Sequence, residues 1–205
     1  MEWQAIGLDQ AKLYYDLHLT RDFPPEEMKP FSVITELWQK AQYEAWGCFD
    51  PAGRLQAYAY LFWPEGGEYT LLDYYAVLPE YRAAGLGGLM LSRLAKLCAP
   101  RFKGILIESE DPAHAPDEAM ARRRLGFYTR AGAQWLGLGA RLFGGHYLIC
   151  CLPCRPGAAL DDARAAMEET YRQLVPPYYY AGNVNIFSLE EGDSEPASQT
   201  AVWGG

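Results

Sequence analysis

The chain has 205 residues, of which 50% are hydrophobic and 21% charged, and its formal net charge is −8. This length and composition are typical of one globular domain with room for an appendage. The negative charge argues against nucleic acid as a partner, because neutralising phosphates takes clustered lysine and arginine.

The sequence carries no sign of membrane insertion or export. It has no run of about 18 apolar residues, and residues 1–4 lack the basic-then-apolar order of a signal peptide. Five cysteines at irregular spacing are typical of reduced thiols and not of a disulfide framework. We therefore expect a cytoplasmic protein without a membrane partner, present as a monomer or a homodimer.

Helical spacing of apolar residues predicts two N-terminal helices, over residues 9–19 and 30–42. Pro24-Pro25 separates them, since proline disrupts a helix interior. Short connections, among them the turn sequence Asp50-Pro51-Ala52-Gly53, predict an antiparallel meander after the helices. Its strands are the runs rich in aromatic and β-branched residues, 43–49, 55–63 and 69–78.

The second half of the chain predicts a parallel crossover and then further strands and helices. Residues 86–97 keep helical spacing, and the apolar run 104–107 suits a strand buried on both faces. Strand, helix and strand in this order make a right-handed crossover, so the strands containing Val77 and Ile105 should run parallel. Beyond them we expect a helix over 117–131 with Asp117 as N-cap, strands over 134–138 and 146–152, a helix over 158–174 and a short strand over 183–189.

Together these elements predict a mixed α/β fold, with a mostly antiparallel central sheet flanked by helices and a C-terminal helical extension. We assign the core domain to residues 1–153. Residues 154–189 should form a helix and short strand packed on that core, and residues 190–205 an acidic mobile tail.

A glycine-rich segment stands where the crossover helix begins, and it reads Arg82-Ala83-Ala84-Gly85-Leu86-Gly87-Gly88. Glycines at a helix start are costly unless the backbone must approach a ligand, and converging N–H groups there favour a phosphate. Leu89 stands where a P-loop requires lysine, which excludes that motif. Met90 replaces the third glycine of a dinucleotide fingerprint, but the acid Glu108 keeps a nicotinamide-dependent enzyme as an alternative.

The segment closely resembles the acyl-CoA loop of the GNAT superfamily of N-acetyltransferases. That loop has Arg or Gln, two variable residues, Gly, one residue, and Gly or Ala, as in Arg82-Ala83-Ala84-Gly85-Leu86-Gly87. A second family element matches Phe127-Tyr128, followed by Gly132. The resemblance covers about residues 1–152. It implies an acetyltransferase that moves an acetyl group from acetyl-CoA to a primary amine of a small molecule or peptide, by direct attack in a ternary complex.

The resemblance also implies which residues hold the donor. The strand ending near Val77 would offer backbone groups to the pantetheine arm, and the following amides would hold the pyrophosphate. The cofactor residues are then Ala76, Val77, Arg82, Ala83, Ala84, Gly85, Leu86, Gly87 and Gly88. Ala121 departs from the family, many of whose members carry an asparagine there.

Four residues are candidates for the chemistry. The resemblance places Tyr128 where the family has a tyrosine that protonates the leaving thiolate. Glu108 and Glu110, two apart on a strand, share one face at its carboxyl end and suit a base. Asp73 is a charge on an otherwise apolar strand, and it could act as base, bind substrate or pair with an arginine among 122–124.

Other patterns favour no further site. Cys151 and Cys154 have redox-motif spacing without the context of a redox fold, and we expect no metal site. The three histidines are scattered. Tyrosines and Trp46 on the predicted strands could line an aromatic cleft, although sheet packing explains them as well. A non-catalytic acyl-CoA-binding or interaction module remains the second alternative to an enzyme.

Overall fold

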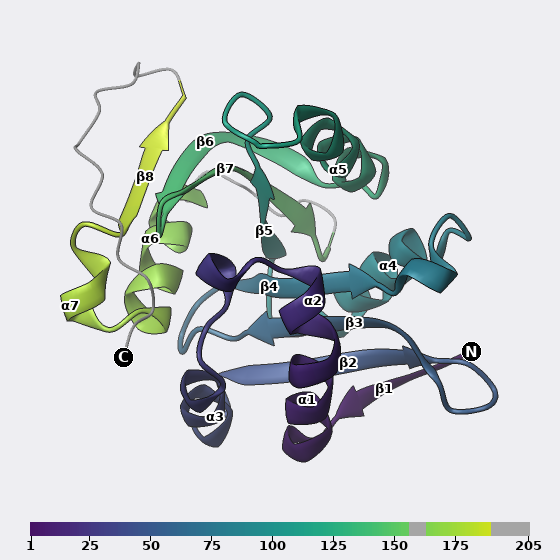
Figure 1. The fold of residues 1–205 in the computed structure, drawn as a ribbon. Helices are drawn as coiled ribbons and strands as arrows, with labels where there is room; N and C mark the ends of the chain where they lie inside the picture. The colour runs from purple at the N-terminus through teal and green to yellow at the C-terminus, as the bar shows by residue number, and fades with distance from the viewer. Residues whose placement is uncertain (156–162, 190–205) are drawn as a thin grey trace. The chain divides into compact units, whose positions relative to one another are not determined.

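The computed structural model describes residues 1–155 and 163–189, and these form two compact units (Figure 1). The first unit contains Met1–Trp63 and Leu72–Arg93, and the second contains Pro64–Leu71 and the described residues from Leu94 onward. The predicted acidic tail lies outside the described residues, and the domain boundaries at residues 153 and 189 stay predictions.

The first unit is built on four neighbouring strands in the order β1-β2-β3-β4. Strands β1 and β2 pair antiparallel, as do β2 and β3, and this agrees with the predicted meander. The edge strand β1 was not predicted, because Ile6 is its only buried residue and so no apolar alternation marks it. The strands are β1 (Glu2–Ile6), β2 (Tyr43–Phe49), β3 (Leu55–Phe62) and β4 (Tyr69–Val77), the last being shared with the second unit.

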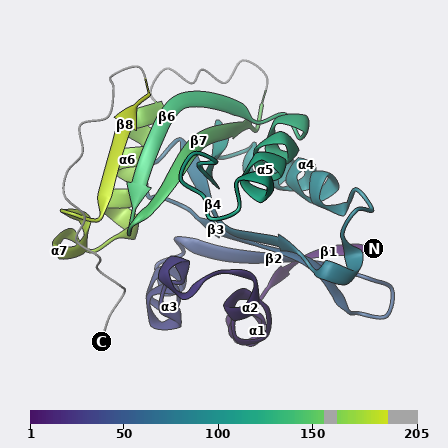
Figure 2. The ribbon, with the colours of Figure 1, turned by 45° about the horizontal axis from the view of Figure 1, so that its top comes forward.

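Both predicted N-terminal helices are present and cover one face of these strands (Figure 2). The segment predicted over 9–19 is α1 (Leu8–Tyr14) continued by a π-helical turn, η1 (Tyr15–Leu19), and by α2 (Thr20–Asp22). The second helix is α3 (Phe31–Gln39), preceded by the short 3₁₀ turn η2 (Pro25–Glu27).

Buried tyrosines attach this helical layer to the sheet. Tyr60 donates its hydroxyl hydrogen to the carbonyl of Ala11 at 2.7 Å, and Tyr58 donates to Asp22 Oδ2 at 2.9 Å. Neither tyrosine has any exposed surface. A buried phenol needs a partner for its hydroxyl, so these bonds fix where the helices sit. Sheet packing therefore accounts for these aromatic residues, and the predicted aromatic cleft is not needed to explain them.

The second unit has the strand order β4-β5-β7-β6-β8. Strand β5 (Gly104–Glu110) pairs parallel with β4 over Tyr69–Leu71 and antiparallel with β7 along its whole length. The parallel pair confirms the predicted crossover. The other strands are β6 (Gln134–Leu142), β7 (Gly145–Pro153) and β8 (Val184–Ser188), joined by antiparallel pairing.

Two long helices of the second unit carry residues discussed below. Helix α5 (Glu118–Arg130) begins as predicted, since Asp117 Oδ1 accepts a hydrogen bond from the amide of Met120 at 2.8 Å. Helix α6 (Ala163–Leu174) is followed by α7 (Pro177–Tyr180). The chain is thus a mixed α/β fold with mostly antiparallel strands flanked by helices, as predicted. Within residues 1–155 and 163–189, every helix is too short or too polar to cross a bilayer.

Candidate active site

The predicted cofactor loop leads from β4 through the 3₁₀ turn η3 (Pro79–Tyr81) to α4 (Leu86–Cys98). Ala83 and Gly85 have positive φ angles of 66° and 75°, which turn the chain into the helix. The amide of Leu89 donates to the carbonyl of Gly85 at 3.2 Å, closing the first helical turn. Amides before Leu89 lie at the helix start, where no intrahelical acceptor exists, so they can bind an anion.

Contacts within the first unit fix this loop from the side of β4. The hydroxyl of Tyr75 donates to the carbonyl of Gly87 at 2.7 Å, and Arg82 Nε donates to the carbonyl of Val77 at 3.0 Å. A methyl group built on Gly85 or Gly88 would meet no atom within 4 Å. The loop therefore presents its backbone on an open side, as an anion-binding loop requires.

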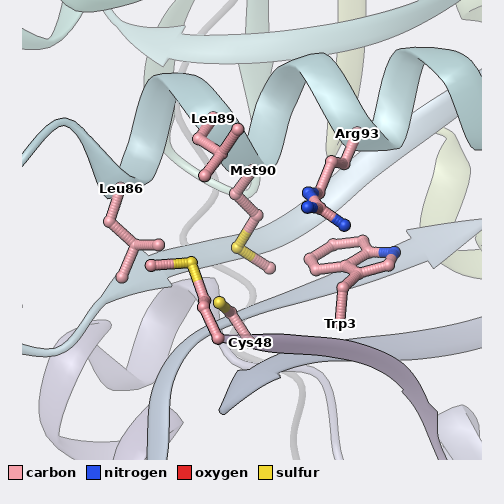
Figure 3. A pocket seen from close by; sticks show the side chains of 7 residues that line it. Trp3, Cys48, Leu86, Leu89, Met90 and Arg93 are labelled. Atoms are coloured by element: carbon pink, nitrogen blue, oxygen red, sulfur yellow. The ribbon is translucent and has the colours of Figure 1, made fainter. Parts of the chain in front are cut away.

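Beneath the start of α4 lies a small apolar hollow of about 210 Å³, open to solvent (Figure 3). Side chains of α4 face β1 and β2 across it, and Leu86 points into it and away from solvent. Its lining has no carboxylate or histidine, so it anchors the helix and offers no acid or base. The lining residues are Met1, Trp3, Cys48, Leu86, Leu89, Met90 and Arg93.

Asp73 lies on β4 in a buried ion pair. Its Oδ1 is 2.5 Å from Lys29 Nζ, and the two side chains are only 4% and 8% exposed. The hydroxyl of Tyr43 donates a hydrogen bond to Oδ2, and burial together with the charge of Asp73 raises the pKa of Tyr43 well above its usual value. The partner of Asp73 is therefore a lysine from the loop before α3, and not an arginine among 122–124, which was one of the alternatives that the sequence left open.

Lys29 joins the same network through its backbone. Its amide donates to the hydroxyl of Tyr74 at 2.8 Å, and Tyr74 in turn donates to the carbonyl of Glu27 at 3.0 Å. The Lys29 ammonium also lies 5.3 Å from the centre of the Tyr74 ring. The loop before α3 is thus pinned to β4 by charge, hydrogen bonds and a cation–π contact.

Glu108 and Glu110 lie on β5 in the second unit, both half-buried and on one face, as the alternation of the strand predicts. The Tyr171 hydroxyl of α6 donates a hydrogen bond to Glu108 Oε1. Glu110 Oε2 is 3.5 Å from Nη1 of Arg124 on α5. The two carboxylates therefore have different partners, one a neutral phenol and the other a guanidinium.

Tyr128 is buried near the end of α5, with 7% of its surface exposed. Burial raises the pKa of its hydroxyl, the positive charge of Arg124 opposes this, and the nearby Cys150 and Glu108 add to it. Tyr128 consequently stays protonated well beyond neutral pH, as a proton donor must.

A histidine pair that the sequence does not reveal is formed by His114, in the loop after β5, and His146, on β7. The rings of His114 and His146 stack with centres 4.1 Å apart, and His114 Nδ1 is 2.9 Å from Asp111 Oδ2. Among the residues that the structure describes, no group of three or more His, Cys, Asp and Glu side chains is placed to hold a metal ion.

A profile of the Acetyltransferase (GNAT) family matches residues 12–127, more than half of the chain. The chain belongs to this family. The matched segment contains the glycine loop together with Asp73, Glu108 and Glu110, and it ends one residue before Tyr128. Members of the GNAT family use acetyl-CoA, and its phosphates are anions of the kind that amides at a helix start can bind.

Solved GNAT structures share the fold. A protein from Bacteroides thetaiotaomicron assigned to the GNAT family is 22% identical, with a TM-score of 0.60 over 84% of this chain and 95% of that one. Mutant forms of the spermidine/spermine N-acetyltransferase SpeG from Vibrio cholerae are 12% identical, with a TM-score of 0.55 over 75% and 94%. The ribosomal-protein-S18-alanine N-acetyltransferase from Escherichia coli is 17% identical, with a TM-score of 0.56 over 75% and 93%. No curated protein matches the chain.

Sequence reasoning missed the partners of the candidate carboxylates of this GNAT chain, among them Lys29 and Tyr171. Tyr171 had a signal, because it falls on the apolar stripe of the helix predicted over 158–174, where a hydroxyl needs a partner. Lys29 had none, since a single lysine in a loop looks like any solvated charge. Of the arginines 122–124, Arg122 pairs with Glu118 at 2.7 Å on an exposed face of α5.

Proposed function

We propose that the protein transfers an acetyl group from acetyl-CoA to a primary amine of a small molecule or peptide, within a ternary complex. The observation that carries the proposal is the open glycine loop at the start of α4, inside the segment that matches the GNAT family. The family match favours an acyl-CoA donor and therefore argues against the alternative of an enzyme that binds a nicotinamide dinucleotide.

The residues of the loop suit the donor chemically. The amides from Arg82 to Gly88 would bind the pyrophosphate, whose charge the N-terminus of α4 favours. The backbone of Ala76 and Val77 would bind the pantetheine arm, although the carbonyl of Val77 also accepts from Arg82. When bound, acetyl-CoA supplies an acyl thioester.

Glu108 and Tyr128 are the base and acid we favour for this reaction. Glu108 would take one proton from the acceptor ammonium, whose pKa is near 10.4 in an alkylamine, and so free the lone pair. Tyr128 would donate a proton to the sulfur as the carbon–sulfur bond breaks. The balance is one new amide, one thiol and one proton released to solvent. Glu110 would serve as a substrate anchor, whereas Asp73 is buried and both of its oxygens are already engaged by Lys29 and Tyr43.

The amine class rests on the fold and on the names of proteins that share it. Structures sharing this fold include enzymes named for spermidine and for the alanine of ribosomal protein S18. Both names denote amines, one on a small molecule and one on a protein. The acceptor of this chain is therefore sought among both kinds.

A thermal-shift panel tests the donor. At 100 times its dissociation constant, acetyl-CoA should add about 2.7 kcal/mol of stability, which raises Tm by about 5–11 °C for a chain of this size. A larger shift with NAD than with acetyl-CoA would overturn the proposal. Size-exclusion chromatography with light scattering decides between monomer and homodimer.

Gly88→Ala sharpens the same test. The added methyl group meets no atom of the protein, and alanine in place of glycine stabilises a helix by up to about 1 kcal/mol. We expect a higher Tm without ligand but a smaller shift with acetyl-CoA, because the methyl group covers the anion side. Gly7→Ala is the matched control, another glycine at a helix start with open space around it. If acetyl-CoA raises the Tm of Gly88→Ala as much as that of the wild type, the loop does not bind the donor.

Thiol release then tests turnover over polyamines, amino acids, aminoglycosides and peptides. The chain itself has five cysteines, so each assay is read against enzyme without donor. Intersecting double-reciprocal plots are expected for a ternary complex, whereas parallel plots would indicate an acyl-enzyme. Donor binding without release of CoA for any amine would indicate the binding-module alternative.

A further inference from the structure

The C-terminal helix α6 makes direct contact with the candidate base. Tyr171 donates its hydroxyl hydrogen to Glu108 Oε1, and the two residues lie 63 positions apart in the chain. Tyr171 is 4% exposed, so this hydroxyl is removed from solvent. A buried phenol and a half-buried carboxylate are hydrogen-bonded to each other here, and the phenol is shielded from bulk water.

Helix α6 is held in place on both sides of this contact. Thr170 and Leu174 are each 2% exposed. Further along, the amide of Glu65 donates to Gln173 Oε1 at 2.8 Å, and Gln173 Nε2 donates to the carbonyl of Glu65 at 3.1 Å. The position of Tyr171 is thus set by packing and by hydrogen bonds that do not involve Glu108.

Several groups face Glu108 besides the phenol of α6. Tyr128 comes from α5, and the charge of Glu108 contributes to its raised pKa, after burial and Cys150. Glu110 lies on the same face of β5 and is paired with Arg124 at 3.5 Å. The residue opposite Glu108 on β7 is Ile149, which is apolar and buried. Any change in the ionisation of Glu108 must be read against these neighbours.

We propose that Tyr171 is a positioning residue of the acetyl-transfer site, holding the Glu108 carboxylate in one orientation and favouring its ionised form. The proposal rests on the proposed function. Helix α6 would then take part in acetyl transfer, although it lies beyond residue 127, where the match to the family profile ends. A hydroxyl donor stabilises a carboxylate relative to the carboxylic acid, so the bond keeps Glu108 ready to take a proton.

Tyr171→Phe removes the hydroxyl and leaves the ring, and Thr170→Val is the matched control. Thr170 is the neighbouring buried residue of α6, but its hydroxyl donates to the carbonyl of Ala166 in the same helix. Two readouts are needed. One is the titration midpoint of the Glu108 carboxyl, followed by NMR with labelled glutamate and assigned through Glu108→Gln. The other is the acidic limb of kcat/KM against pH, with one acceptor amine used throughout.

In Tyr171→Phe we expect the Glu108 midpoint to rise by about one pH unit, and the acidic limb to move up with it. Below that limb kcat/KM should fall about tenfold, with Tm and the KM for acetyl-CoA little changed. Thr170→Val should move neither midpoint nor limb. Adding Tyr171→Phe to Glu108→Gln should cost little more activity, because the residue that the phenol positions is already gone.

The outcomes separate this proposal from the function on which it rests. An unchanged Glu108 midpoint in Tyr171→Phe overturns the positioning role, whatever the activity. A raised midpoint with an unmoved acidic limb also overturns it, since the contact would then not reach the reaction. If the wild-type chain acetylates no amine, the proposed function and with it the positioning role in catalysis fall, while the NMR midpoint still reports whether the contact governs Glu108.

Discussion

The buried pair of Lys29 and Asp73 predicts a large and strongly non-additive effect on stability. Lys29→Met keeps the length of the side chain but leaves the Asp73 carboxylate, 4% exposed, without its ammonium. Asp73→Asn leaves the ammonium, 8% exposed, without its carboxylate, while the amide oxygen can still accept from Tyr43. The double variant removes both charges together.

The magnitude follows from the desolvation of each charge. Breaking a buried ion pair from one side costs about 3–5 kcal/mol, whereas replacing the pair by uncharged groups of similar volume is often close to neutral. Each single variant should therefore lose about 3 kcal/mol or more, equivalent to about 6–12 °C in Tm. The double variant should lose about 1 kcal/mol, the cation–π contact of Lys29 with Tyr74 being part of that.

Urea unfolding followed by tryptophan fluorescence measures these free energies, and the coupling energy is their departure from additivity. Single variants that each cost less than about 1 kcal/mol and simply add would refute the reasoning. Activity gives a second reading of the same variants. If Asp73 only holds the loop before α3, the double variant regains acetyl transfer along with stability. If Asp73 is the base, the double variant stays inactive.

Three further predictions concern single elements. Because burial raises the pKa of Tyr128, the plot of kcat/KM against pH should show no alkaline limb from this group up to about pH 10. Tyr128→Phe should lower kcat about 100-fold. An alkaline limb centred below about pH 9 that Tyr128→Phe abolishes would contradict this. Asp117→Ala removes the N-cap of α5 and should lower the stability measured by calorimetry by about 1 kcal/mol, whereas Asp117→Asn should lower it much less. Equal losses in the two variants would show that the Asp117 side chain does not cap the helix. Gly104→Ala places a methyl group 2.4 Å from Cys151 Sγ and 3.3 Å from the carbonyl of Leu152. The clash should lower the free energy of unfolding, measured in urea, by about 1–3 kcal/mol. Adding Cys151→Ala should relieve much of that loss, and additive losses in the double variant would argue against the clash.

The fold could be predicted where local patterns agree with packing. Runs rich in aromatic residues marked β2 and β3, and a short apolar run marked the buried β5. The pattern failed at β1, an edge strand in which Ile6 is the only buried residue. It also could not show the π-helical turn of η1, because apolar spacing does not distinguish that turn from an α-helix.

The site could be predicted only as far as each residue's own strand or helix. Glu108 and Glu110 share a face because alternation along one strand requires it. Their partners come from α6 and α5, which lie later in the chain, and no spacing rule joins these segments. Pairing of Asp73 with an arginine was one of the alternatives, but its partner is Lys29, a loop residue that follows no period and is positioned by tertiary contacts alone.

The described partners of the three carboxylates determine which contact each would lose on taking up a proton. Protonating Asp73 would leave the buried ammonium of Lys29 without a counter-ion, at the cost already estimated for breaking the pair. Protonating Glu110 would likewise weaken its contact with the guanidinium of Arg124, although that pair is more exposed and costs less to lose. Glu108 accepts from a neutral phenol, which orients the carboxylate without cancelling its charge, and a protonated Glu108 leaves behind no unpaired cation on Tyr171. The contact with Tyr171 thus orients Glu108 as a charged carboxylate, which is the form in which it would act as the base proposed above.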